Sequence, residues 1–214
     1  QALERRFGDW LTDRYGSLEK AFDAWGKRES GDDAGAGRAA LYEAWHTTGA
    51  SVNQAGESKK RRLSDQVRFL TELQRGFYEE TIEFIREDLG SESLISPGNW
   101  HTSDPVMLDA LERYTYTAGE VIDRHGYFSG PHESNDGSHS YDVRVGHTFE
   151  NQSALLIPED IPLQFIQTAE HPQTISEIGW TNPNLYRADY AFLASAYGAL
   201  QGVDSIMTFA MGGA

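Results

Sequence analysis

The sequence predicts an α/β fold in which parallel strands alternate with helices. Strand-like and helix-like patterns alternate from about residue 63 to the end of the chain. A short β-branched run at 174–178 is followed at once by a helical pattern over 184–200. The chain of 214 residues, 39% of them hydrophobic, is long enough to bury the core of one domain or most of one.

The first part of the chain is expected to be helical. Apolar and aromatic residues recur at helical spacings over residues 3–25, and the break at Tyr15-Gly16 divides this stretch in two, with Ser17 as N-cap of the second helix. Residues 28–38 are rich in Gly, Asp and Ser and predict a surface loop. A further helix is expected over 38–46. The basic run at 59–62 predicts a solvated helix face and not a nucleic-acid site.

The longest helix is expected over residues 63–89, with Gly90 at its C-terminal stop. The elements predicted after it are a strand at 94–100, a helix over 105–118 capped by Ser103 or Asp104, a strand at 120–127, a long loop over 129–172, a strand that carries Glu177, a helix over 186–200 and a last strand at 204–210. Four strands therefore end near residues 99, 125, 177 and 210.

Four parallel strands with crossover helices form half of an eight-stranded (β/α) barrel, of the TIM-barrel type. The predicted organisation is one partial barrel domain over 1–214. It divides into a helical excursion (1–62), two βα units (63–128), the long loop (129–172) and a last βα unit with the final strand (173–214). Half a barrel has two open edges, through which the chain would be able to self-associate.

Composition excludes several classes of partner. The net charge of −15 argues against nucleic acids and anionic membranes, which select positive surfaces. No apolar run approaches the length of a transmembrane helix. The chain has no Cys, which excludes disulfides and thiolate metal sites. It begins at Gln1 without Met and ends directly after a strand-like run, so we expect a piece of a longer polypeptide.

Glu177 is the strongest candidate for chemistry. A carboxylate at the C-terminal end of a strand, before a βα loop, is where barrel enzymes place catalytic groups. His125 and Tyr127 are two residues apart on the preceding strand, so their side chains share a face and could donate hydrogen bonds that keep the carboxylate ionised. In the alternative interpretation His125 and Tyr127 are packing residues, and Glu177 caps a strand or pairs with an arginine.

Aromatic and amide residues at neighbouring strand ends fit a carbohydrate site. Trp100 and Trp180 could offer flat surfaces on which a sugar ring stacks, and Asn99 and Asn182 could bond its hydroxyls. Tryptophan at a strand end is equally often part of the core. A general acid also needs a second carboxylate. None of the available ones is at a predicted strand end that faces Glu177; they are Asp104, Glu120, Asp123, Glu133 and Asp136.

The long loop suggests one further alternative, a divalent metal site. It contains His132, His139, His147, Glu133, Asp136 and Asp142. Their spacing matches no recognised ligand motif, so we expect neither a metal nor another cofactor.

These residues together carry a resemblance to a known family. The triplet His125-Gly126-Tyr127 before Ser176-Glu177 resembles the clan A glycoside hydrolases, which are retaining enzymes on a TIM barrel. Further segments are similar to bacterial cellulase-like glycosidases: Phe69-Leu70, Phe77-Tyr78, Asn99-Trp100, Pro183-Asn184, Tyr186-Arg187-Ala188 and Ala196-Tyr197-Gly198-Ala199-Leu200. The opening Trp10-Leu11, Arg14-Tyr15-Gly16-Ser17 and Ala24-Trp25-Gly26 are similar to the segment after the fourth strand of β-galactosidase-like members.

The resemblance implies that the four strands are the fifth to eighth of the barrel. It makes Glu177 the nucleophile, His125 and Tyr127 its orienting partners, and a glutamate after an asparagine on the fourth strand the acid/base. No such pair is present before Gln1, so the chain is expected to hold half an active site and to be catalytically silent alone. The resemblance also implies export, so we expect a secreted or periplasmic protein.

Three functions are therefore carried forward. The leading one is a fragment of a retaining glycoside hydrolase that acts on a β-linked glycan. The second is a non-catalytic carbohydrate-binding barrel, and the third is a metal-dependent hydrolase that uses the His-rich loop.

Overall fold

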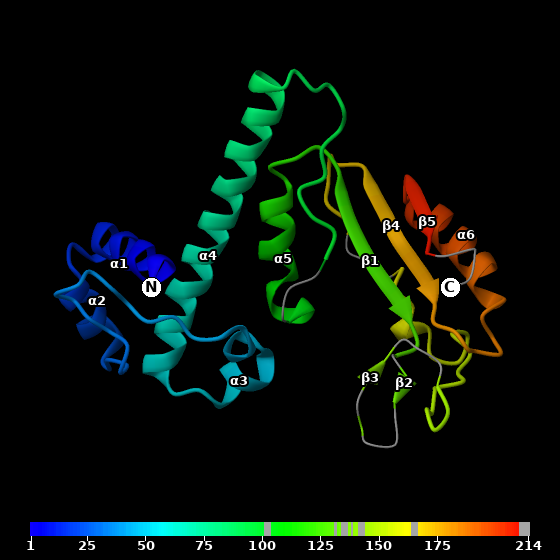
Figure 1. Cartoon of the computed structure of the whole chain (residues 1–214), viewed down its shortest axis with the longest axis horizontal. Coiled ribbons are helices and arrows are strands. Elements are labelled where there is room, and N and C mark those ends of the chain that lie inside the picture. Colours follow the sequence, from blue (N-terminus) through cyan, green and yellow to red (C-terminus); the bar gives the residue numbers. More distant parts are fainter. Residues whose placement is uncertain are drawn as a thin grey trace. The chain divides into compact units, whose positions relative to one another are not determined.

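The computed structural model describes residues 1–100, 104–130, 132–133, 137, 139–140, 144–163 and 167–209. The chain forms two compact units (Figure 1). The N-terminal unit comprises Gln1–Ser91 and His101–Ala118, and the C-terminal unit comprises Glu92–Trp100 and Gly119–Ala214. The segment 63–128, predicted as two βα units, is thus divided between them. In the part of the chain that the structure describes, no helix is both long enough and apolar enough to cross a membrane.

The N-terminal unit is helical. Its elements are α1 (Ala2–Tyr15), α2 (Leu18–Trp25), a 3-10 turn (Ala44–Thr47), α3 (Gly49–Gln54), α4 (Glu57–Glu83), a π-helical turn that continues α4 (Phe84–Asp88) and α5 (Pro105–Tyr116). The predicted division of the first helical stretch is confirmed, because Ser17 Oγ accepts a hydrogen bond from the Lys20 amide at 3.2 Å and caps α2. The predicted capping of α5 is also confirmed, with Asp104 accepting from the amides of Val106 and Met107.

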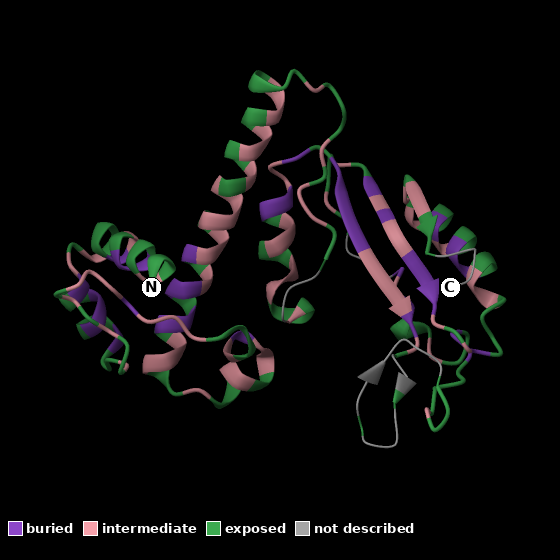
Figure 2. Cartoon of the chain, in the orientation of Figure 1, coloured by how far each residue is buried: buried purple, intermediate pink, exposed green. Residues whose placement is uncertain are grey.

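An aromatic cluster forms the core of this unit. Phe7, Phe22, Trp25 and Phe69 are almost fully buried, and the ring centroids of Phe7 and Phe69 are 5.0 Å apart. Figure 2 shows these buried residues concentrated where α1 and α2 pack on the first half of α4. Burial of each such side chain contributes about 1.5–3 kcal/mol, which is why these short helices hold together.

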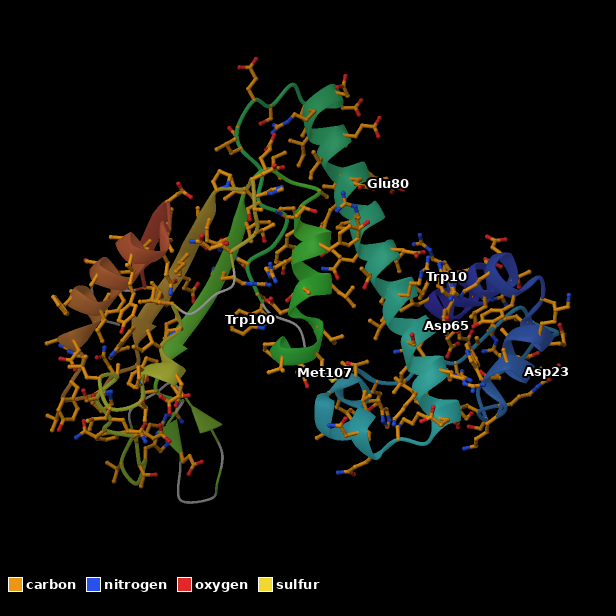
Figure 3. All side chains as sticks on the ribbon, turned by 180° about the vertical axis from the view of Figure 1, so that it is seen from behind. Trp10, Asp23, Asp65, Glu80, Trp100 and Met107 are labelled. Atoms are coloured by element: carbon orange, nitrogen blue, oxygen red, sulfur yellow. The ribbon has the colours of Figure 1, made fainter. Side chains whose placement is uncertain are left out.

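A buried carboxylate links the aromatic cluster to α4. Asp65 accepts hydrogen bonds from Tyr15 Oη at 2.7 Å and Trp25 Nε1 at 2.8 Å. Trp10 and Asp65 lie where α1 meets α4 (Figure 3). Burial, with the hydrogen bond to Asp65, raises the pKa of Tyr15 above its ordinary value of 10.0. Tyr15 therefore stays a neutral donor to this carboxylate at physiological pH.

Two expectations for the N-terminal unit were wrong. Residues 38–46 do not form the expected α-helix: only the 3-10 turn from Ala44 is helical, and the Ala40 and Tyr42 amides before it bond to the side chains of Asp32 and Gln66, each at 2.8 Å. The basic run at 59–62 is not wholly solvated either, since Arg62 is only 2% exposed. Local composition could not reveal these long-range partners.

The close approach of α1 to the loop at 28–38 leads to a prediction. A Cβ on Gly8 would stand 2.3 Å from the Gly37 carbonyl oxygen, which is backbone and cannot rotate away. Gly8→Ala should therefore destabilise the N-terminal unit by about 1–3 kcal/mol despite the better helix propensity of alanine. Gly76→Ala in α4 is the matched control, because no atom lies within 4 Å of its added Cβ, and it should stabilise by up to about 1 kcal/mol. Urea denaturation of both variants measures the difference, and equal shifts would contradict the packing explanation.

The C-terminal unit contains a parallel sheet of three strands in the order β1–β4–β5. Its elements are β1 (Ile122–Phe128), a short antiparallel pair of β2 (His132–Glu133) and β3 (His139–Ser140), a 3-10 turn (Pro158–Asp160), β4 (Gln173–Trp180), α6 (Asp189–Gln201) and β5 (Ser205–Thr208). The helix α6 connects β4 to β5 and packs Leu193 and Ala194 against Ile175 and Ile178 of the sheet.

The half-barrel prediction was wrong. The described residues contain three parallel strands in one open sheet, a small α/β domain, and not four strands of a barrel. The missing strand is the segment 94–100. It meets the chain before and within β1 only near its ends, where the Ile95 carbonyl accepts from the Glu120 amide at 2.9 Å and the Asn99 carbonyl accepts from the His125 amide at 2.8 Å.

The physical reason lies in residues 96–98. Pro97 has no amide hydrogen and Gly98 lacks the side chain that favours an extended strand, so a continuous ladder does not form between the two contacts. Self-association was expected through the open edges of a half barrel, whereas the observed edges are those of a small sheet. Self-association stays a prediction.

Candidate functional site

A bulge in β4 creates the candidate site. Between Ile175 and Ile178, β4 has one residue more than either neighbour, because Thr174 and Glu177 pair with Asp123 and His125 of β1. Both Ile175 and Ile178 are fully buried in the same core, although residues three apart on a regular strand face opposite sides. The extra residue resolves this conflict and directs the side chains of Ser176 and Glu177 to one place.

Three predicted residues meet there. The Tyr127 hydroxyl donates a hydrogen bond to Oε1 of Glu177. The His125 Nδ1 atom lies 3.5 Å from Oε2 of the same carboxylate, at ion-pair distance. The side chain of Glu177 is 30% exposed, whereas that of His125 is 12% exposed. The carboxylate is therefore oriented from one side and open to solvent on another.

The structure adds two residues that the sequence analysis did not assign. Ser176 Oγ lies 2.8 Å from His125 Nε2 and donates its hydroxyl proton to Asp123 Oδ2. The Ser176 amide donates to Asp123 Oδ1 at 2.8 Å. Asp123 is 5% exposed, so this carboxylate is buried and paired through Ser176. The positions of Asp123, His125 and Tyr127 at alternate residues of one strand could have indicated Asp123, but the bulge that brings in Ser176 has no local signal.

Asn99 and Trp100 border this cluster. The Trp100 ring is perpendicular to the His125 ring, with centroids 6.2 Å apart, and Trp100 is 56% exposed. The Asn99 side chain is exposed, while its backbone carbonyl holds the His125 amide. On the other side, Phe209 stands edge-on to Tyr127 at 6.4 Å and is 60% exposed. Exposed aromatic rings therefore flank the His125 and Tyr127 side chains.

Trp180 and Asn182 lie elsewhere. Trp180 is 6% exposed and packs between Phe128 and Tyr190, with ring centroids 5.1 and 5.0 Å away, so its ring belongs to the core. Its Nε1 atom is buried and has no hydrogen-bond partner among the described residues. The Asn182 amide oxygen accepts a hydrogen bond from Arg187 at 2.5 Å. Among the described residues, no hydrogen bond or ring contact joins Trp180 or Asn182 to Glu177.

Most of the candidate metal ligands of the His-rich loop fall outside the description of the structure. Asp136, Asp142 and the side chains of His132 and His139 lie outside the part of the chain that the structure describes. Within the described ranges, no three His, Asp or Glu side chains are grouped so that they could hold a metal ion.

A cavity among the described residues is in the N-terminal unit. It measures about 550 Å³ between α4, α5 and the preceding loop, with Leu63, Val67, Leu108 and Leu111 among its lining residues. None of the predicted site residues lines it, and we give the Glu177 cluster greater weight because a cavity without an arranged reactive group indicates no chemistry. A smaller hollow of about 310 Å³ adjoins Tyr127, and Glu150 and Asp160 are on its wall.

Comparison of the chain with protein-family models, with curated proteins and with solved structures gave no match in any of the three cases. The candidate site therefore depends on its own geometry, an oriented and partly exposed carboxylate beside a buried Asp–Ser–His chain.

Proposed function

We propose that the chain carries the nucleophile of a retaining β-glycosidase. The observation that supports this proposal is the Glu177 carboxylate, held by the Tyr127 hydroxyl at Oε1, close to His125 at Oε2, and 30% exposed. In a double displacement, Glu177 attacks the anomeric carbon, the glycosidic C–O bond breaks, and a glycosyl ester forms. Water then cleaves this ester and returns the carboxylate.

Each neighbour has a role in this proposal. Tyr127 and His125 hold the two carboxylate oxygens of Glu177 and fix the direction of its attack. In this proposal the exposed Trp100 ring, beside His125, offers a surface for the apolar face of a sugar, and the exposed Asn99 side chain bonds a hydroxyl. A carbohydrate is therefore the proposed substrate.

The general acid is proposed to be a glutamate outside this sequence. Asp123 does not suit that role, because it is buried and both its oxygens accept hydrogen bonds from Ser176. An ordinary glycoside needs a proton on its leaving oxygen, so the 214-residue chain should leave it intact. A glycoside whose leaving group is a strongly acidic phenol needs no such proton and should still transfer its sugar to Glu177.

The test follows from this difference. The 214-residue chain is incubated with a panel of 2,4-dinitrophenyl 2-deoxy-2-fluoro-β-glycosides, in which fluorine slows hydrolysis of the glycosyl ester. Peptide mass spectrometry then locates the sugar. An adduct on the peptide that holds Glu177 supports the proposal and identifies a preferred sugar. An adduct on a different carboxylate overturns the assignment of Glu177. Measurable glycan binding without any adduct instead favours the carbohydrate-binding alternative, for which the exposed Trp100 ring is the supporting feature.

Replacement of Tyr127 tests the orienting contact. A hydrogen bond to a charged group contributes about 1.5–3 kcal/mol, so Tyr127→Phe should slow the labelling of Glu177 by about 10- to 100-fold. Tyr190→Phe is the matched control, because the Tyr190 hydroxyl also has a partner, Thr208 Oγ1 at 2.7 Å, but its ring packs in the core against Trp180. Dinitrophenolate release measures both rates. Equal slowing in the two variants would mean that Tyr127 acts on the fold and not on the carboxylate.

A further inference from the structure

The hydrogen bonds around His125 constrain where protons can reside. Ser176 has a single hydroxyl proton, and its Oγ atom lies between Asp123 Oδ2 and His125 Nε2. The second ring nitrogen, Nδ1, faces Glu177 Oε2 at 3.5 Å. The proton position on His125 Nδ1 therefore depends on how Asp123 and Ser176 share their protons in this series of hydrogen bonds.

Two arrangements place a proton on Nδ1, where it faces the Glu177 carboxylate. In the first, Asp123 is ionised, Ser176 donates to it, and His125 carries protons on both Nε2 and Nδ1. In the second, Asp123 is protonated and donates to Ser176 Oγ, Ser176 donates to Nε2, and neutral His125 carries its proton on Nδ1. Both arrangements contain one proton more than an ionised Asp123 with a neutral His125.

Without that proton, the arrangement is unfavourable. If neutral His125 carries its proton on Nε2, the Nδ1 lone pair faces the negative Glu177 oxygen. If it carries the proton on Nδ1, the single Ser176 proton cannot serve both Asp123 and Nε2, and two lone pairs face each other at Ser176. Because Asp123 is 5% exposed, water is poorly placed to offer it or Ser176 another partner.

We infer that Asp123 is a positioning residue that acts through Ser176, and that Asp123 and His125 share one added proton which keeps an Nδ1–H group directed at Glu177. This inference rests on the proposed function of Glu177 as nucleophile. The inference also implies that the added proton on Asp123 and His125 is held less strongly after Glu177 has reacted. When Glu177 becomes a neutral glycosyl ester, the negative charge that favours the added proton is lost.

Among the residues that the structure describes, the groups placed around His125 belong to the C-terminal unit. Asp123 and Tyr127 come from β1, and Ser176 and Glu177 come from β4. From the segment 92–100, the Trp100 ring lies perpendicular to the His125 ring, and the Asn99 carbonyl oxygen accepts from the His125 amide. The Arg124 guanidinium donates to the Trp100 carbonyl at 2.5 Å. Among these described partners, the carboxyl groups are those of Asp123 and Glu177.

We call the hydrogen-bonded series Asp123–Ser176–His125 the relay, and Asp123→Asn tests it directly. With its amide oxygen on the Ser176 N–H, the Asn amide nitrogen would donate to Ser176 Oγ. Ser176 would then donate to Nε2, and His125 would hold Nδ1–H while neutral. Nitrogen NMR of the His125 ring, assigned by its loss in His125→Gln, distinguishes these forms. We expect a protonated Nδ1 near pH 7 in both proteins. A wild-type His125 protonated on Nε2 alone would overturn the inference.

The pH profile of Glu177 labelling provides the readout that a merely structural role would not change. In the wild type, labelling should slow about tenfold when alkaline pH removes the shared proton, whereas Asp123→Asn should lack this decline. Ser176→Ala, which breaks the relay, should label about tenfold slower than wild type across the range. Identical profiles for wild type and Asp123→Asn would refute the relay. The NMR result does not depend on the proposed function. If NMR supports the relay but no carboxylate is labelled, only the glycosidase proposal is refuted.

Discussion

Glu177→Gln is expected to lower the rate of glycosyl transfer from an activated glycoside by about 10⁴-fold or more, because loss of a catalytic nucleophile lowers rates by factors of this size. Glutamine matches glutamate in shape and leaves an oxygen for the Tyr127 hydroxyl, but it has neither the charge nor the nucleophilicity of a carboxylate. Dinitrophenolate release and the mass of the labelled peptide measure this loss.

Two controls separate chemistry from folding. Glu170→Gln changes an exposed carboxylate shortly before β4 and should leave the rate unchanged. The melting temperature of Glu177→Gln should stay close to that of the wild type, because the site carboxylate is partly exposed. If Glu177→Gln is labelled as fast as wild type, Glu177 is not the nucleophile.

Azide provides a stereochemical test of the same residue. From an activated β-glycoside, the wild type should yield a β-glycosyl azide, because attack by Glu177 and then by azide inverts the anomeric carbon twice. Glu177→Gly opens space for azide to attack directly, and the single inversion should yield the α-glycosyl azide. The same anomer from both proteins would contradict the double displacement through Glu177.

The second large effect is expected in the N-terminal unit, at the ion pair of Asp32 and Arg62. The guanidinium binds the carboxylate through two hydrogen bonds, Nη1 to Oδ2 at 2.7 Å and Nη2 to Oδ1 at 2.5 Å. The side chains are 0% and 2% exposed, respectively, and the guanidinium carbon lies 4.5 Å from the Trp25 ring centroid. The backbone amides of Glu29 and Ala40 also donate to Asp32.

Asp32→Ala should destabilise this unit by about 3–5 kcal/mol, since it leaves a buried cation and two amides without their acceptor. Urea denaturation followed by tryptophan fluorescence measures the free energy of unfolding. Asp33→Ala is the matched control at the next residue. Its pair with Arg38 is exposed and 3.4 Å long, so the change should be small. A small effect at Asp32 would show that the ion pair does not hold the loop at 28–38.

The same carboxylate predicts a loss of stability in acid. Burial by itself would raise the pKa of Asp32, but hydrogen bonds from Arg62 and from the Glu29 and Ala40 amides outweigh it and hold the pKa below its ordinary value of 3.8. Because folding lowers this pKa, the ionised carboxylate contributes stability above about pH 4, and the contribution is lost as the pH falls through the folded-state pKa. Asp32→Asn should unfold with a weaker dependence on pH in this range.

Local features of the sequence determined many of the elements. The Ser17 and Asp104 caps follow from side chains that bond the amides two or three residues later, and both are where the sequence predicts them. The strand period places His125 and Tyr127 on one face, and the β-branched run before Glu177 forms β4. These predictions succeed because capping and periodicity involve only residues that are near one another in the chain.

The tertiary structure decided the rest. The count of strands depends on whether the segment at 94–100 completes a ladder with β1, and Pro97 and Gly98 interrupt it. The Asp123–Ser176–His125 chain depends on an unpaired residue in β4, and the burial of Arg62 depends on Asp32, thirty positions away. Each is a contact between residues far apart in sequence, whose formation reflects packing and strand register. The sequence pattern indicates Glu177, His125 and Tyr127 as candidate site residues, but only the folded sheet shows which side chains surround them.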